Sequence, residues 1–188
     1  HHFAAVRTGT TIKLFLDGNQ EVSTTQGQGM VSGGRTLDIA LNRSSSLTYL
    51  KIYISNLRIV KGTAIYTATF TPPTAPLTAI SGTSLLLNAT NAGIFDATGK
   101  NDLITVGDAR VSTSVTKYGS GAMYFDGTGD YLSIPTPVNL IMGTSDWTIE
   151  CWVYISSRTL NYPIIIGNNN GSYSAGALAL VNNNNDSA

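Results

Sequence analysis

The 188-residue sequence predicts an all-β fold in which two antiparallel sheets pack as a sandwich. Apolar and polar residues alternate over many short segments, as they do in strands with one buried face. Gly, Asn, Asp and Pro separate these segments at close intervals, which is typical of strands joined by turns. No segment has the apolar spacing of an amphipathic helix, and we expect at most one helical turn, near residues 137–142.

The chain begins with a predicted hairpin. Residues 3–7 and 11–17 are expected to pair as antiparallel strands, because Thr8-Gly9-Thr10 between them is a turn sequence. Asp17-Gly18 tolerates the positive φ angles that a second tight turn requires. One face of the strand over 11–17 is apolar and carries Ile12, Leu14 and Leu16.

Residues 20–49 are polar and rich in glycine, so we expect loops and edge strands here, with one short strand near Leu37–Leu41. The apolar residues from Leu50 to Ile59 alternate but change phase within the run. A β-bulge near Ser55-Asn56 would explain this change, and two separate strand ends would explain it as well. A lid is then expected to pack back on the sheet through Ile65, Tyr66 and Phe70.

Residues 71–83 contain three prolines and predict an extended connector, because proline is excluded from central strands. This connector is a candidate boundary between two segments, residues 1–70 and 84–188. Stacked sheets would bury the apolar strand faces of the two segments against each other.

In the second segment, strand patterns over 123–125 and 131–134 flank residues 126–130, which we interpret as a hairpin-type loop. The clearest strand of the chain covers residues 147–155. Its apolar face consists of Trp147, Ile149, Cys151, Val153 and Ile155. The opposite face consists of Thr148, Glu150, Trp152 and Tyr154.

Composition excludes several classes of partner. The formal net charge is zero, charged residues are only 12%, and no basic block is present, which argues against nucleic acid and anionic membranes as partners. No apolar run approaches the roughly 18–20 residues needed to span a bilayer, so we expect no membrane insertion. The single cysteine, Cys151, is expected to be a small core hydrophobe rather than a nucleophile.

Ordered motifs of the chain resemble those of concanavalin A-like, laminin-G-like domains. The family's opening motifs, Tyr-Phe-Asp-Gly-x-x-Asp-Tyr-Leu and Trp-Thr-Ile-Glu-x-Trp-Val, are matched at residues 124–132 and 147–153. A later motif, Trp-His-His-x-Ala-x-x-Arg with a following Leu-x-x-Asp-Gly, is matched at residues 1–18 without its leading Trp. The last motif, Tyr-Ile-Ser-Asn-Leu-Arg-Ile-Val-Lys-Gly-Thr-Ala, is present at residues 53–64. The resemblance implies a jelly-roll sandwich.

The late motifs precede the early ones in this chain. The resemblance therefore implies that residues 1–70 are the C-terminal type of half and residues 84–188 the N-terminal type of half. Each half alone would expose an apolar face and unpaired strand edges, so the halves should meet. They can close within one chain as a permuted sandwich, which we favour, or between neighbouring chains.

No catalytic arrangement is evident. The carboxylate trio Glu-x-Asp-x-x-Glu of related glucanases is missing, since Glu21 and Glu150 are the only glutamates. We therefore predict that the chain is not an enzyme.

Carbohydrate binding is the leading functional hypothesis, because aromatic faces contact the C–H surface of sugars while amides and carboxylates bind their hydroxyls. Two places offer such groups: the outer face of the strand over 147–155 and the loop over 168–173. A face covered by other segments, and a plain Asn/Gly turn, are the respective alternatives. The candidate residues are Glu150, Trp152, Tyr154, Asn168, Asn169, Asn170 and Tyr173.

A cation site is a weaker hypothesis. Asp108, Asp126 and Asp130 offer oxygen ligands of the kind that Ca²⁺ takes, so calcium is a candidate cofactor. The alternative is turn chemistry, in which these carboxylates accept local backbone hydrogen bonds, and we prefer it.

The chain's motifs near residues 55–64 and 70–77 are similar to repeats in bacteriophage tail or fibre proteins. The prediction is a non-catalytic carbohydrate-binding or adhesive module of a repetitive virion or cell-surface protein. Its expected partners are glycans or cell-surface polysaccharide and neighbouring copies of the same protein. The alternative is a purely structural spacer or filament subunit that makes protein–protein contacts.

Overall fold

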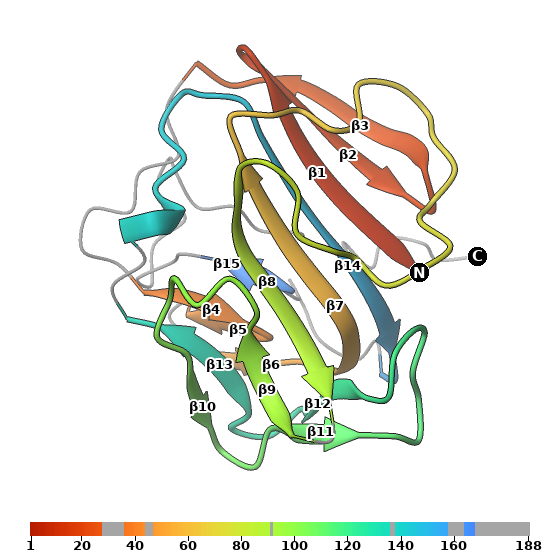
Figure 1. Ribbon diagram of the computed structural model, residues 1–188, viewed down its shortest axis with the longest axis vertical. Helices are drawn as coiled ribbons and strands as arrows, with labels where there is room; N and C mark the ends of the chain where they lie inside the picture. The colour runs from red at the N-terminus through yellow and green to blue at the C-terminus, as the bar shows by residue number, and fades with distance from the viewer. Residues whose placement is uncertain (28–35, 44–46, 91, 136–137, 158–163, 168–188) are drawn as a thin grey trace.

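The computed structural model describes residues 1–27, 36–43, 47–90, 92–135, 138–157 and 164–167. Within these residues, antiparallel sheets pack face to face, which confirms the predicted all-β sandwich. Figure 1 shows the larger sheet running from β3 to β11 and the smaller sheet, with β4, β10 and β13, at the lower left. The described residues contain one short 3₁₀ turn, Val138–Leu140, and no helix of membrane-spanning length.

The larger sheet has nine strands within the described residues. Seven of them follow one another across the sheet in the order β11 (Arg110–Ser112), β12 (Ala122–Asp126), β7 (Lys51–Lys61), β14 (Trp147–Ile155), β1 (His2–Thr8), β2 (Thr11–Leu16) and β3 (Asn19–Thr25). The other two are β8 (Thr83–Thr90), which pairs with β7, and β9 (Gly93–Asp96), which pairs with β8. The predicted hairpin is confirmed as β1 and β2, with turns at Gly9-Thr10 and Asp17-Gly18.

The smaller sheet covers one face of the larger one. Within the described residues it contains β10 (Ile104–Val106), β13 (Tyr131–Ile134), β4 (Leu37–Ile39) and β15 (Ile166–Gly167). A separate hairpin, β5 (Leu41–Arg43) and β6 (Leu47–Tyr49), follows β4 in the chain. The short strand expected near Leu37–Leu41 is therefore present as β4 and the start of β5.

Strand β7 lies at the centre of the larger sheet. Along one edge it pairs with β14 over nearly its whole length, while its other edge is shared by β12 and β8. Strands from both segments therefore belong to one sheet of one chain, with β7 between β12 and β14, and β14 between β7 and β1. The connector over 71–83 leads into β8, which pairs with β7 in the same sheet.

A β-bulge interrupts β7 where its neighbour changes from β12 to β8. Ile54 lies opposite Val153 and Leu57 lies opposite Cys151, so Ser55 and Asn56 together oppose the single residue Trp152. This confirms the bulge predicted at Ser55-Asn56. Side chains of a regular strand alternate between its two faces, so Leu57 would face away from the side of Ile54 without the bulge. The extra residue brings Leu57 and Ile59 back to the inner face.

One apolar core lies between the two sheets and receives side chains from both segments. Cys151 is fully buried there, in agreement with its predicted role as a core residue, and burial raises the pKa of its thiol. The largest contributions come from side chains with no more than 1% exposure: Ile39, Ile52, Ile54, Leu57, Ile59, Leu85, Leu87, Met123, Phe125, Leu132, Ile134, Trp147, Ile149 and Ile166.

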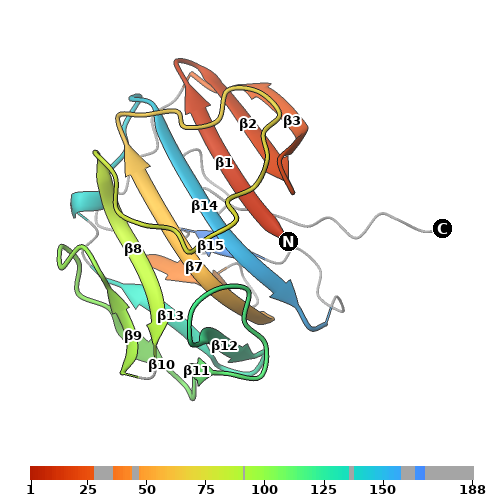
Figure 2. The ribbon, with the colours of Figure 1, turned by 45° about the vertical axis from the view of Figure 1, so that its right-hand side comes forward.

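Residues 62–80, which we call the strap, cross the outer face of the larger sheet. Figure 2 shows this segment, in yellow, passing in front of β1 and β14 before it reaches β8. Tyr66 and Phe70 of the strap stack on each other with ring centroids 3.6 Å apart. Both pack against a small apolar cluster formed by Phe15 of β2 with Ala4 and Val6 of β1. The Ile65 N–H donates to Thr148 Oγ1 over 2.9 Å. The predicted lid is therefore confirmed.

The hairpin-type interpretation of residues 126–130 is wrong. Strand β12 belongs to the larger sheet and β13 to the smaller one, so the loop between them crosses from one layer to the other. The chain crosses between the same layers a second time at residues 107–109, between β10 and β11. A period-2 pattern shows which face of a strand is apolar but does not show to which sheet the strand belongs.

Candidate functional site

The predicted platform on the outer face of β14 is largely covered. Glu150 has 0% and Trp152 has 7% exposure, whereas Tyr154 has 55%. The strap lies over Glu150, and Tyr118 of the loop 113–121 lies edge-on against the Trp152 ring at 5.5 Å. Of the two alternatives for this face, the covered one is observed at Glu150 and Trp152, while Tyr154 is exposed.

Glu150 is the centre of a buried polar cluster. Arg58 donates to Glu150 Oε1 from Nε over 2.9 Å and from Nη2 over 2.5 Å. The Tyr66 hydroxyl donates to Glu150 Oε2 over 2.8 Å, and His2 Nε2 lies 3.2 Å from the same oxygen. These four contacts match the roughly four acceptor positions of a carboxylate, so the hydrogen-bonding capacity of Glu150 is taken up within the protein.

The electrostatics of this cluster favour an ionised Glu150. Burial by itself raises the pKa of Glu150, but His2, Arg58 and Tyr66 outweigh burial and lower it below its ordinary value. Burial and the Glu150 charge together raise the pKa of the Tyr66 hydroxyl, which therefore stays protonated and donates. The cluster is a structural link between the sheet and the strap, because Arg58 Nη1 also donates to the strap carbonyl of Thr78 over 2.7 Å.

Beyond the strap, three tyrosines form a row across neighbouring strands, which we call the tyrosine row. Tyr124 of β12 pairs with Tyr53 of β7, and Tyr53 pairs with Tyr154 of β14. The ring centroids of Tyr53 lie 4.5 Å from Tyr124 and 6.0 Å from Tyr154. Arg110 of β11 extends the row, with its guanidinium carbon 4.8 Å from the Tyr124 ring centroid. The row is half-buried at Tyr53 and Tyr124 and exposed at Tyr154.

Sequence analysis did not identify Tyr53 and Tyr124 as site residues. Each lies on the polar face of its own strand, and the alternation of apolar and polar residues in the sequence indicates this placement. Their proximity arises because β7 lies between β12 and β14, three strands that are far apart in the chain. Period-2 patterning alone does not reveal which strands become neighbours.

A small pocket adjoins the tyrosine row at the β7 bulge. Its volume is about 110 Å³, well below the few hundred Å³ of a typical small-molecule site, so it suits one substituent of a larger ligand. The loop 113–121 is fixed beside the pocket because the Lys117 N–H donates to Ser55 Oγ over 2.8 Å. The lining residues are His1, Tyr53, Ser55, Val115, Thr116, Lys117, Trp152, Val153 and Tyr154.

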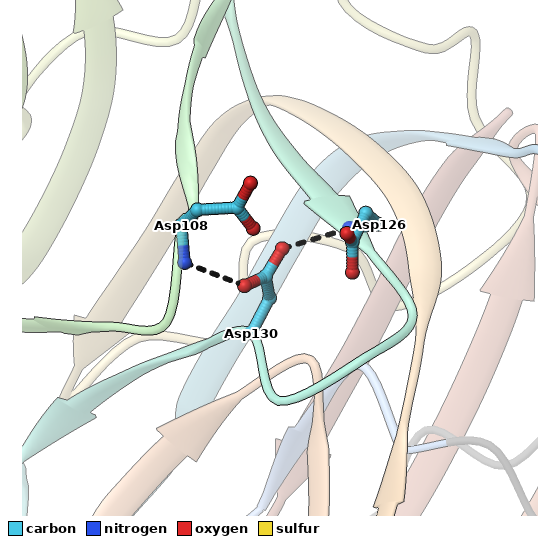
Figure 3. Close-up of side chains that lie close together, drawn as sticks. All are labelled: Asp108, Asp126 and Asp130. Atoms are coloured by element: carbon cyan, nitrogen blue, oxygen red, sulfur yellow. Dashed lines mark hydrogen bonds between the residues drawn. The ribbon is translucent and has the colours of Figure 1, made fainter.

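The three candidate metal ligands do come together. Figure 3 shows Asp108, Asp126 and Asp130 where the two crossings between the sheets lie side by side, and one carboxylate oxygen of each lies within 4.8 Å of the others. Asp130 is fully buried, and its two oxygens accept the backbone N–H groups of Asp108 over 2.8 Å and of Asp126 over 3.0 Å. Burial raises the pKa of Asp130, and the nearby Asp126 adds to this effect.

Two hydrogen bonds of this aspartate cluster are local, as turn chemistry predicts, because Asp130 accepts the Asp126 N–H and Asp126 accepts the Thr128 N–H. The bond from the Asp108 N–H to Asp130 is not local, since it joins residues 22 positions apart. Asp126 Oδ1 accepts the Thr128 N–H over 2.7 Å, and Asp108 Oδ2 pairs with Arg110 over 2.8 Å. Three carboxylates would supply only part of the six to eight oxygens that Ca²⁺ takes. The cluster therefore acts first as a clasp that joins the two crossings.

The remaining candidates for sugar binding lie outside the described residues. They are Asn168, Asn169, Asn170 and Tyr173.

Comparison of the chain with models of known protein families, with curated proteins and with solved structures found no match. The assignment of function therefore depends on the chemistry of the surfaces described above.

Proposed function

We propose that this chain is a non-catalytic carbohydrate-binding module that contacts glycan chains through the tyrosine row and the adjoining pocket. The observation that carries the proposal is the alignment of Tyr124, Tyr53 and Tyr154 across three neighbouring strands on the outer face of the larger sheet. Aromatic rings offer an apolar face to the C–H surface of a sugar, and tyrosine hydroxyls can also exchange hydrogen bonds with sugar hydroxyls.

The dimensions of the row favour an extended ligand. Neighbouring strands are about 4.8 Å apart, so the row extends over roughly 10 Å, which is longer than one sugar ring. Cross-strand ring contacts also hold Tyr53 in place between its two neighbours, which reduces the side-chain entropy lost on binding. A polysaccharide or oligosaccharide lying across the strands is therefore a better fit than a free monosaccharide.

The proposed setting is a repetitive virion protein, such as a tail or fibre, or a cell-surface protein. The motif resemblance to concanavalin A-like domains and to phage tail repeats supports this setting, as does a composition rich in Ser, Thr, Asn and Gly and poor in charged residues. In such a protein, repeated copies would raise a weak affinity per site to a useful avidity.

The experiment is a glycan-array screen of the 188-residue chain, followed by titration calorimetry with the polysaccharide that binds. Tyr154→Ala and Tyr53→Ala should each weaken binding about tenfold, because each removes a ring contact worth roughly 1.4 kcal/mol. Tyr49→Ala is the matched control, since Tyr49 lies in β6, outside the row, and its ring contacts that of Tyr131 in the smaller sheet. Binding to no glycan, or equal loss in all three variants, would contradict the proposal.

A second candidate function is a structural spacer or filament subunit, and one observation favours it. All seven residues of β3 are exposed, and β3 is the last strand of the larger sheet within the described residues. An exposed strand edge can pair with another chain. Sedimentation velocity over a range of concentrations tests this role: Val22→Lys, which adds a charge to the edge, should abolish any concentration-dependent assembly while leaving glycan binding intact.

A further inference from the structure

The pocket beside the tyrosine row contains a cation without a carboxylate partner. The Lys117 ammonium lies 4.8 Å from the Trp152 ring centroid and 5.6 Å from that of Tyr118. Each ion pair found among the described residues involves other groups, so no carboxylate from that part of the chain lies within 4.0 Å of Lys117. Cation–π contacts hold this charge at the pocket but do not neutralise it.

A second group in the pocket wall independently favours an acceptor on the ligand. Trp152 lines the pocket with only 7% of its surface exposed, and its indole Nε1–H is buried with no hydrogen-bond partner within the described part of the chain. A buried donor without an acceptor lowers stability, and an oxygen atom supplied by a ligand would satisfy it.

We propose that this pocket binds the carboxylate of an acidic sugar, so that the module selects glycans containing uronic acids. The inference rests on the proposed function and names its substrate class. A carboxylate fits the observations because it is a small planar group suited to a volume of about 110 Å³. Its oxygens can take the charge of Lys117 and the Trp152 N–H together, while the sugar ring lies against Tyr53 and Tyr154.

Sugars without a charged group are expected to bind at this pocket with lower affinity. A hydroxyl can accept the indole N–H but carries no charge to pair with the exposed Lys117 ammonium, and this difference is the source of the selectivity. Sulfated sugars also carry anionic oxygens, but a tetrahedral sulfate ester is bulkier than a carboxylate. The experiment therefore includes a sulfated polymer as a separate probe.

The test is titration calorimetry of the 188-residue chain with oligogalacturonate, hyaluronan oligosaccharides, fully methyl-esterified oligogalacturonate and dextran sulfate. The methyl ester keeps the sugar ring and removes the charge. We expect at least one uronate probe to bind at least tenfold more tightly than the ester and than dextran sulfate. Lys117→Gln should remove this preference, because glutamine carries no charge to pair with the carboxylate.

Lys61→Gln is the matched control, because it makes the same charge change at the opposite end of β7 and should retain the preference. Trp152→Phe, which keeps an aromatic ring but lacks the N–H, should reduce the preference. Equal affinity for acid and ester, or a preference that survives in Lys117→Gln, would overturn this inference. If ester binding were then still lost in Tyr53→Ala, the proposed function would stand without it, whereas failure of every glycan to bind would overturn both.

Discussion

Arg58 and Glu150 face each other across the β7–β14 ladder, with Arg58 Nη2 2.5 Å from Glu150 Oε1 and both side chains buried beneath the strap. Two strands from the separate segments of the sequence are thus joined by a charge pair that solvent does not reach. Because Arg58 also donates to Thr78 O, the pair holds the strap against the sheet.

Replacement of Glu150 by Gln should destabilise the fold strongly. The amide keeps the shape of the side chain but leaves the Arg58 charge buried without its partner, a change that costs about 3–5 kcal/mol. Urea denaturation followed by tryptophan fluorescence measures the free energy of unfolding. Glu21→Gln, at an exposed position of β3, is the control and should change it by less than about 0.5 kcal/mol. Similar values for the two variants would show that the buried pair contributes little.

The same cluster predicts a loss of stability in acid. The pKa of Glu150 is lowered in the folded state, so its contribution is complete above its ordinary value of 4.5 and is lost as the pH falls through the folded-state pKa. Unfolding free energies of the wild type should therefore fall below about pH 4.5 more steeply than those of Glu150→Gln. Parallel pH profiles for the two proteins would exclude Glu150 as a source of the acid sensitivity.

Gly18 is a close contact point between the first hairpin and the strap. Its φ is +83°, and a Cβ atom here would lie 1.9 Å from the carbonyl oxygen of Phe70. Gly9 has a similar φ of +59° but no atom within 4 Å of such a Cβ. Gly9→Ala should therefore cost only the backbone strain of about 1–2 kcal/mol.

Gly18→Ala should cost about 1–3 kcal/mol more than Gly9→Ala, because the strap must move away from the added methyl group. Amide hydrogen exchange gives a local readout, since the Phe70 N–H donates to Gly18 O over 3.0 Å. Exchange at Phe70 should accelerate in Gly18→Ala and not in Gly9→Ala. Equal exchange and equal stability in the two variants would show that the strap is not anchored at Gly18.

Features that depend on local pattern were predictable from the sequence. The phase change between Ile54 and Leu57 located the bulge, and the turn residues Asp17-Gly18 located the end of the first hairpin. The apolar residues Tyr66 and Phe70 identified the lid, because an exposed stacked pair in a loop would be unfavourable.

Features that depend on strand order were not predictable in the same way. The tyrosine row requires Tyr53 to lie between Tyr124 and Tyr154, and no local pattern specifies this order. Glu150 is a related case: the sequence shows that it lies on the polar face of β14 but leaves open whether that face is covered, because the strap that covers it follows a different strand. Neighbours that are distant in sequence decide whether a polar face is a site or a buried link.

Asp130 offers a final test, at the clasp between the two crossings. Its two carboxylate oxygens accept the backbone N–H groups of Asp108 and Asp126. Asn has a single acceptor oxygen, so Asp130→Asn leaves one of these donors facing an NH₂ group. An unsatisfied buried donor costs about 1–3 kcal/mol, and we expect a value near the lower end, because the burial that raises the pKa of Asp130 also penalises the charge that Asn lacks.

Asp102→Asn, at an exposed position, is the matched control and should leave stability unchanged. Hydrogen exchange at the Asp108 and Asp126 amides should be faster in Asp130→Asn than in the control, which separates loss of the clasp from a general loss of stability. Unaltered exchange at both amides would show that other contacts hold the crossings together. The three aspartates would then need another reason for lying within 4.8 Å of one another.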